Sequence, residues 1–197
     1  MAAFWPIPEQ ELRCASFLKP YVAQMRSIHQ QGTKWYFNQR NWDDYVRLLG
    51  LAWAQEVAAL RPTEIWIDSG AGSGQALMDY LAQYSGQVVG ISAALENWDK
   101  YWLAQAMQRY PGRFNFYVGL LETPLAYWPP LINSDILTDV YGPMAYTHAP
   151  DVVLAHYAAL LRPGGKAWIL LPQQGLHLYQ RGRNLRTTTP LRPLAWR

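Results

Sequence analysis

The sequence predicts an α/β protein in which a mostly parallel sheet is covered by helices on both faces. Short apolar runs alternate with helical segments between residues 64 and 171, and prolines and glycines separate them. Half of the 197 residues are hydrophobic, which is enough for one packed domain and excludes a disordered chain. Strands that are joined through helices cannot form hairpins, so we expect parallel neighbours with right-handed crossovers.

The expected elements follow one another in a regular alternation. The five expected strands are residues 64–68, 87–91, 114–118, 136–140 and 166–171. The helices expected between them are residues 75–84, 93–110 and 151–161. Pro111–Gly112 and the run 162–165 carry the glycine and proline signals that end helices.

Helical segments also precede the first strand. Residues 8–30 read as an interrupted helix, and residues 41–60 place apolar side chains at steps of three and four, as on one buried helix face. We expect residues 1–62 to form a helical cap that belongs to the same domain as the α/β unit at 63–197. The aromatic side chains of this cap have two readings, either as a cover over a ligand-binding site or as part of the hydrophobic core. They are Trp35, Tyr36, Phe37 and Trp42.

Charge and cysteine content exclude several classes of site. The net charge is +3, yet residues 152–197 hold seven cations and no anion. This basic tail is typical of a solvated segment, and nucleic-acid binding is the alternative, weakened by the scarcity of aromatics. The single cysteine excludes an intrachain disulfide, and the histidines show no ligand spacing, so we expect no metal site. No secretory signal or apolar run of membrane-spanning length is visible, so we expect a cytoplasmic protein with no membrane partner.

The most informative segment follows the first strand, where Asp68 precedes three glycines at alternate positions, Gly70, Gly72 and Gly74. Glycines there let the backbone turn sharply and approach a ligand, and the helix start that follows favours anionic groups. A dinucleotide fingerprint needs a glycine where this chain has Gln75 or Leu77, so that reading fails.

The pattern D-x-G-x-G-x-G resembles the first motif of class I S-adenosylmethionine-dependent methyltransferases. The run 135–142 resembles the family's fourth strand, which ends in a carboxylate, and the run 160–171 resembles its turn into the fifth strand. The resemblance covers about residues 64–172. It implies a Rossmann-like doubly wound fold, S-adenosylmethionine as cofactor and S-adenosylhomocysteine as product.

The resemblance also implies which residues form the site. The implied cofactor-binding residues are Asp68, Ser69, Gly70, Ala71, Gly72, Gly74, Ser92, Leu121, Glu122 and Asp139. Asp68 would face the methionine end and Leu121 the adenine ring, with Glu122 at its amine. The candidate catalytic residues are Asp139, Tyr141 and His148. The alternatives are a turn cap for Asp68, a solvated strand end for Glu122 and an ordinary loop histidine for His148.

Two features depart from the family. Ser92 stands where the family has an acid that binds the ribose hydroxyls. Glu96, one helical turn later, has two readings, as a solvated helix residue or as the alternative ribose ligand. The C-terminus is short: residues 176–180 and 185–189 are expected to form a hairpin that ends a shortened sheet. An uncovered edge strand invites pairing, which predicts a homodimer.

The implied function is in-line transfer of a methyl group to a small-molecule acceptor. The cofactor supplies an activated methyl group, so the acceptor cannot be read from the core of the fold. Two alternatives stay open. One is an RNA or protein methyltransferase that uses the basic tail, and the other is a catalytically silent scaffold of the same fold.

Overall fold

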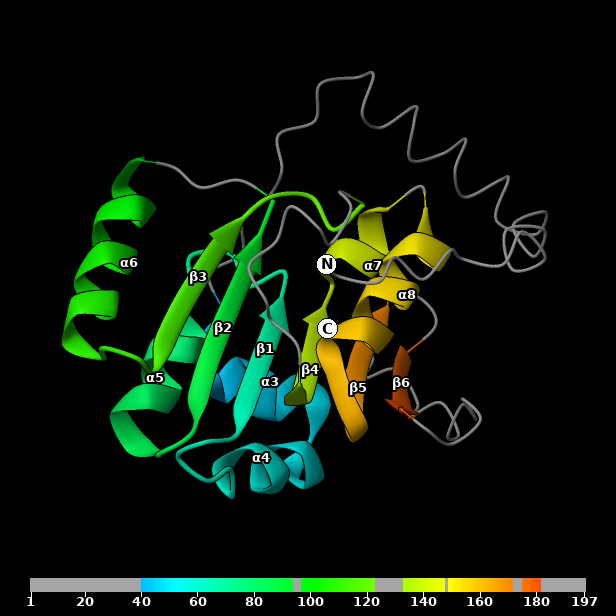
Figure 1. Ribbon diagram of the computed structural model, residues 1–197, viewed down its shortest axis with the longest axis horizontal. Coiled ribbons are helices and arrows are strands. Elements are labelled where there is room, and N and C mark those ends of the chain that lie inside the picture. The colour runs from blue at the N-terminus through cyan, green and yellow to red at the C-terminus, as the bar shows by residue number, and fades with distance from the viewer. Residues whose placement is uncertain (1–39, 94–96, 123–132, 148, 172–174, 182–197) are drawn as a thin grey trace, which may run out of the picture.

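A six-stranded sheet forms the centre of the computed structural model, which describes residues 40–93, 97–122, 133–147, 149–171 and 175–181. Its strands are β1 (Ile65–Ser69), β2 (Gln87–Ser92), β3 (Phe114–Val118), β4 (Ser134–Val140), β5 (Leu161–Leu171) and β6 (Gly175–Gln180). They lie side by side in the order β3-β2-β1-β4-β5-β6 (Figure 1). All neighbours are parallel except β5 and β6, which confirms the expected mostly parallel sheet.

Helices cover both faces of this sheet. They are α3 (Trp42–Leu49), α4 (Leu51–Ala58), α5 (Gln75–Gln83), α6 (Asn97–Arg109), α7 (Pro143–Tyr146) and α8 (Pro150–Leu160). Because side chains alternate along a strand, β1 contributes to two separate cores. Trp66 packs with residues of α3, α4, α5 and α6, whereas Ile67 packs with residues of α8 on the other face.

The expected helix 41–60 is wrong as a single element, because Gly50 divides it into α3 and α4. Gly50 has a φ of 89°, a conformation that glycine adopts without a side-chain clash. Its N–H donates to the carbonyl of Val46 and so ends α3, which begins with a capping box between Asn41 and Asp44. A further difference is the short helix α7, which is not among the expected elements.

Aromatic side chains join α3 and α4 to the sheet. Trp42, Tyr45 and Trp53 pack around Trp66, with ring centroids 5.0 Å apart for Trp42 and Trp53 and 5.5 Å apart for Trp53 and Trp66. Trp42 is 8% exposed, so core packing is the correct reading of this residue. The other cap aromatics and the expected helix 8–30 lie outside the described residues.

The C-terminal strand differs from the expected hairpin. Residues 176–180 do form a strand, but its antiparallel partner is β5, with Lys166 opposite Gln180 and Leu171 opposite Gly175. Only residues 172–174 separate the two strands, so no crossover helix intervenes between β5 and β6. The expected partner strand at 185–189 lies outside the described residues.

Candidate functional site

The glycine-rich loop follows β1 at the carboxyl end of the sheet, where the strand order reverses between β1 and β4. Ligands of open α/β sheets bind at such a switch point. Gly70, Gly72 and Gly74 have φ values of 96°, 55° and 80°, all in the left-handed region. Each of the three alternating positions therefore requires the conformation that glycine tolerates best.

Hydrogen bonds fix this loop to β2. The N–H groups of Gly70 and Ala71 donate to the carbonyl of Ile91 at 2.8 and 3.0 Å. Gly74 is the N-cap of α5 and makes no side-chain capping bond. The first N–H groups of α5 thus begin beside the loop and favour a negatively charged group there.

The loop meets the β4–α7 turn directly. A Cβ atom built on Gly70 would lie 2.6 Å from the Cα of Gly142, which begins the turn into α7. Two backbone segments therefore touch with no side chain between them. The contact brings residues 70 and 142 together at the carboxyl ends of β1 and β4.

Asp68 lies beneath the loop and is 1% exposed. Tyr45 Oη donates to its Oδ2 at 2.6 Å, and Thr138 Oγ1 donates to its Oδ1 at 2.8 Å. Burial raises the pKa of Asp68 to about 6, against the opposing effects of these two bonds and of Arg40. Asp68 thereby links α3, β1 and β4, and its contact with the methionine end of a cofactor stays a prediction.

Asp139 is fully buried at the end of β4. Its Oδ1 accepts from Gly142 N at 2.7 Å, and its Oδ2 accepts from Met144 N at 2.8 Å and from Tyr157 Oη at 2.6 Å. Burial raises the pKa of Asp139 to about 7, and the Asp68 carboxyl adds to the rise. Asp139 thus holds the start of α7, while its catalytic role stays a prediction.

Tyr141 lies between Asp139 and Gly142 in the sequence, and its backbone is strained, with a φ of 50°. Its N–H donates to the carbonyl of Leu170 at 3.1 Å, and the Arg40 guanidinium lies 5.4 Å from its ring centroid. Arg40 also donates to the carbonyl of Val140 at 2.9 Å. A cation and an aromatic ring therefore meet at the end of β4. Nothing in the sequence indicated that Arg40 lies at this site.

The remaining predicted cofactor residues lie at the ends of β2 and β3. Ser92 is 3% exposed and ends β2, and Leu121 is 1% exposed. Glu122 accepts a hydrogen bond at 2.6 Å from the Oγ1 of Thr147, the residue that directly follows α7. Its contact with adenine stays a prediction. Glu96 and His148 lie outside the described residues.

Three residues of the site were missed by the sequence reasoning: Tyr45, Thr138 and Tyr157. Each supplies a hydroxyl donor to a buried carboxylate. The need for donors follows from burying a carboxylate, which is costly without partners. The alternation of β4 places Thr138 on the face of Asp68, but no pattern identifies the two tyrosines.

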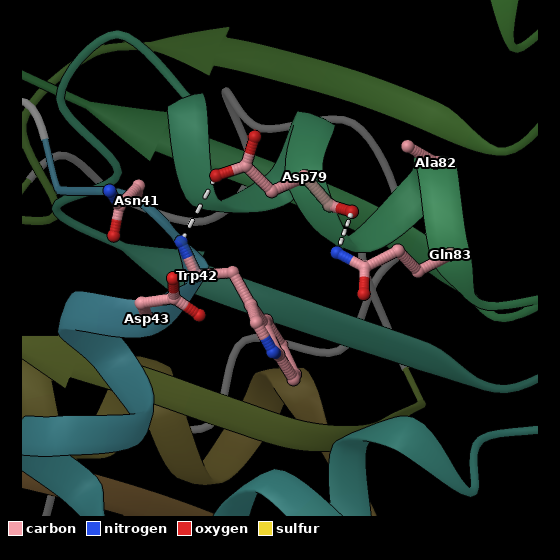
Figure 2. Close-up of a pocket in the computed structure, with 6 residues that line it drawn as sticks. All are labelled: Asn41, Trp42, Asp43, Asp79, Ala82 and Gln83. Atoms are coloured by element: carbon pink, nitrogen blue, oxygen red, sulfur yellow. Dashed lines mark hydrogen bonds between the residues drawn. The ribbon is translucent and has the colours of Figure 1, made fainter.

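The surface hollow in Figure 2 is a separate feature between the start of α3 and α5. Its lining residues are Asn41, Trp42, Asp43, Asp79, Ala82 and Gln83. Asp79 Oδ2 accepts from Trp42 N at 3.1 Å, and Gln83 Nε2 donates to the Asp79 carbonyl at 3.1 Å. None of the predicted site residues lines it. Within the described ranges no three side chains gather as metal ligands, and no helix there is long and apolar enough to cross a membrane.

Comparison with known proteins gives matches only among solved structures, since no family model and no curated protein matches the chain. The [4+2]-cyclase SpnF is 15% identical, with 80% of this chain and 57% of that chain covered and a TM-score of 0.51. A protein from Galdieria sulphuraria, assigned as a sarcosine dimethylglycine methyltransferase, is 16% identical, with coverages of 64% and 44% and a TM-score of 0.50. A methyltransferase from Thiobacillus denitrificans, solved with S-adenosylhomocysteine, is 21% identical, with coverages of 60% and 46% and a TM-score of 0.43.

The chain has a Rossmann-like fold, which it shares with the [4+2]-cyclase SpnF and with the Galdieria sulphuraria protein. It spans about half the length of the solved structures that it matches. One of these structures is a cyclase by its title, so the fold by itself does not fix the reaction.

Proposed function

We propose that the protein is a methyltransferase that binds S-adenosylmethionine over the glycine-rich loop. The observation that carries the proposal is the set of three alternating glycines, all with positive φ, between a buried strand and α5 at the switch point of the sheet. The motif D-x-G-x-G-x-G and the fold both agree with this ligand. A dinucleotide requires a different glycine spacing.

The residues present fit the cofactor unevenly. The loop 70–74 and the N-terminus of α5 suit the methionine end, because backbone N–H groups there favour a carboxylate. Adenine is proposed to lie at the end of β3 beside Leu121, with Glu122 for its amine. At the ribose end Ser92 replaces the usual acid, and one hydroxyl binds two ribose hydroxyls less strongly than a carboxylate does.

The bound cofactor supplies a methyl group that is already activated by its sulfonium. The chain then has to hold an acceptor in line with that methyl group and exclude water. Asp139 and Tyr141, at the end of β4, are proposed to shape the acceptor side. His148 is the proposed base for acceptors that must lose a proton.

The acceptor is proposed to be a small molecule bound between the N-terminal segment, residues 119–131 and residues 141–150. The second candidate is an RNA or protein acceptor recruited by the seven cations of the C-terminal segment. Salt-dependent RNA binding that disappears on deletion of residues 181–197 would favour this second candidate. The third reading is a catalytically silent scaffold of the same fold. The proposed homodimer is a separate point, which light scattering tests.

Calorimetric titration with S-adenosylmethionine and S-adenosylhomocysteine tests the proposal. We expect one site that binds both ligands. Binding should be lost in Gly72→Val, because a β-branched residue disfavours the positive φ of 55° at this position. Gly112→Val is the matched control, with a φ of 73° outside the site. Absence of binding to the wild-type chain at millimolar ligand would overturn the proposal and favour the scaffold.

A further inference from the structure

Tyr157 on α8 connects two segments of the candidate site that are far apart in the sequence. Its hydroxyl donates to Asp139 Oδ2 at 2.6 Å and lies 2.7 Å from Ser69 Oγ. Burial, and then the adjacent Asp139 carboxyl, raise the pKa of Tyr157 well above its usual value, so the hydroxyl keeps its proton. Since that single proton goes to Asp139, the Ser69 hydroxyl donates to Tyr157.

These bonds continue into the β4–α7 turn. Asp139 accepts from the backbone N–H groups of Gly142 and Met144 at 2.7 and 2.8 Å. Gly142 packs against Gly70, the residue directly after Ser69. The connections therefore form a closed ring that runs from the end of β1 through α8 to the end of β4 and back to the glycine-rich loop.

The ring is shielded from water. Ser69 and Asp139 are 0% exposed and Tyr157 is 2% exposed. Tyr157 belongs to the apolar core on this face of the sheet, together with Ile169 of β5 and with Leu154 of α8 packed against it. A tyrosine whose only task was to fill this space would carry a hydroxyl at a cost, because a buried hydroxyl needs a partner. Its bond to a carboxylate points to a specific role.

We propose that Tyr157 is a positioning residue: its hydroxyl fixes the β4–α7 turn against the glycine-rich loop in the arrangement that binds ligand. The proposal rests on the proposed function, because the loop must bind S-adenosylmethionine for this arrangement to matter. Tyr157 lies beneath the site on α8 and acts through Asp139. Binding then depends on a side chain that does not touch the ligand.

The charge of Asp139 links this arrangement to pH. The groups that face Asp139 are Tyr157 on α8, the Asp68 carboxyl on β1, Tyr45 on α3 and the two backbone amides of the turn. The Tyr157 bond lowers the pKa of Asp139 and the Asp68 carboxyl raises it. Without the hydroxyl, Asp139 takes up its proton at a higher pH. A protonated carboxyl accepts less well from Gly142 and Met144, so the turn loosens.

The test compares Tyr157→Phe with Tyr80→Phe. Tyr80 is a buried tyrosine on α5, in the opposite core, and its hydroxyl lies beside the backbone of Gly86 rather than beside Asp139. Two measurements are made on each full-length variant. They are amide hydrogen exchange of residues 139–147 without ligand, and calorimetric Kd of S-adenosylhomocysteine between pH 6 and pH 9.

We expect the amide hydrogens of Gly142 and Met144 to exchange faster in Tyr157→Phe than in the wild type. We also expect ligand binding to weaken about tenfold. The pH at which binding falls to half should also move upward. Tyr80→Phe should leave all three quantities unchanged. Ser69→Ala removes only the donor to Tyr157, so its effect should be smaller than that of Tyr157→Phe.

The outcomes separate this inference from the proposed function. If the wild-type chain binds no ligand, the proposed function fails, while the exchange of Gly142 and Met144 still reports whether Tyr157 fixes the turn. Unchanged exchange in Tyr157→Phe overturns the inference. Faster exchange with an unchanged Kd and an unchanged pH midpoint overturns it as well, because Tyr157 would then support the turn without affecting the site.

Discussion

Gly70 and Gly142 meet backbone to backbone, 72 positions apart in the sequence, at the carboxyl ends of β1 and β4. A Cβ atom on Gly70 would lie 2.6 Å from the Cα of Gly142, and a Cβ atom on Gly142 would lie 3.0 Å from the Cα of Gly70. Neither position has room for a side chain. The glycine-rich loop is therefore shaped by the turn beside it as well as by its own backbone angles.

Gly70→Ala is expected to destabilise the fold more than Gly112→Ala. Both glycines have positive φ, 96° and 73°, so each alanine costs about 1–2 kcal/mol for its backbone. Gly112 has no atom within 4 Å of an added Cβ, whereas Gly70 faces the Gly142 backbone. The clash should add about 1–3 kcal/mol. Urea unfolding measures the difference, and equal losses in the two variants would contradict the contact.

The two buried carboxyl groups predict a pH dependence of stability. Folding raises the pKa of Asp68 to about 6 and that of Asp139 to about 7, from ordinary values near 3.8. Between about pH 4 and pH 7 the folded chain therefore binds protons that the unfolded chain has released. The two carboxyl groups therefore contribute most to the free energy of unfolding below this pH window, and this contribution is lost as the pH rises through it.

Urea unfolding across this range measures the effect. Asp139→Asn removes one of the two titrating carboxyl groups, so the free energy of unfolding should decline less steeply between pH 4 and pH 7. The same change also removes a hydrogen bond to the turn. Asp43→Asn changes an exposed carboxylate on α3 and serves as control. A wild-type stability that rises steadily from pH 4 to pH 7 would contradict the prediction for the buried pair.

The sequence predicted the strands and the loop well because their signals are local. Each expected strand lies on an apolar run that forms a strand in the structure, although β5 already begins at Leu161 rather than at Lys166. The three alternating glycines need no distant partner to be recognised. The break at Gly50 was missed because apolar positions continue at helical steps through it, although its φ is 89°. The tyrosine partners were missed because pairing depends on tertiary structure: Ser69 and Tyr157 are 88 positions apart.

Ser92→Asp is expected to tighten S-adenosylmethionine binding about tenfold, because a carboxylate accepts from both ribose hydroxyls. Ser92→Asn is the control of the same shape without the charge, and it should tighten binding much less. Calorimetry of both variants measures the difference. Unchanged or weaker binding by Ser92→Asp would show that the ribose is held elsewhere.

Thr138 connects two buried polar groups, so its hydroxyl should matter more than its volume. Trp66 Nε1 donates to Thr138 Oγ1 at 2.9 Å, and the same hydroxyl donates to Asp68 Oδ1 at 2.8 Å. Thr138→Val keeps the shape but leaves the indole N–H without an acceptor and Asp68 with one donor fewer. This change should cost about 2–4 kcal/mol.

Thr138→Ser keeps the hydroxyl and loses only a methyl group, so it should cost about 1 kcal/mol. The two variants also differ in their effect on Asp68. The Thr138 bond lowers the pKa of Asp68, so its loss in Thr138→Val should extend the pH-dependent decline in stability to higher pH, whereas Thr138→Ser should not. Urea unfolding at several pH values measures both effects. Equal costs for valine and serine would mean that packing, rather than the hydroxyl, explains this position.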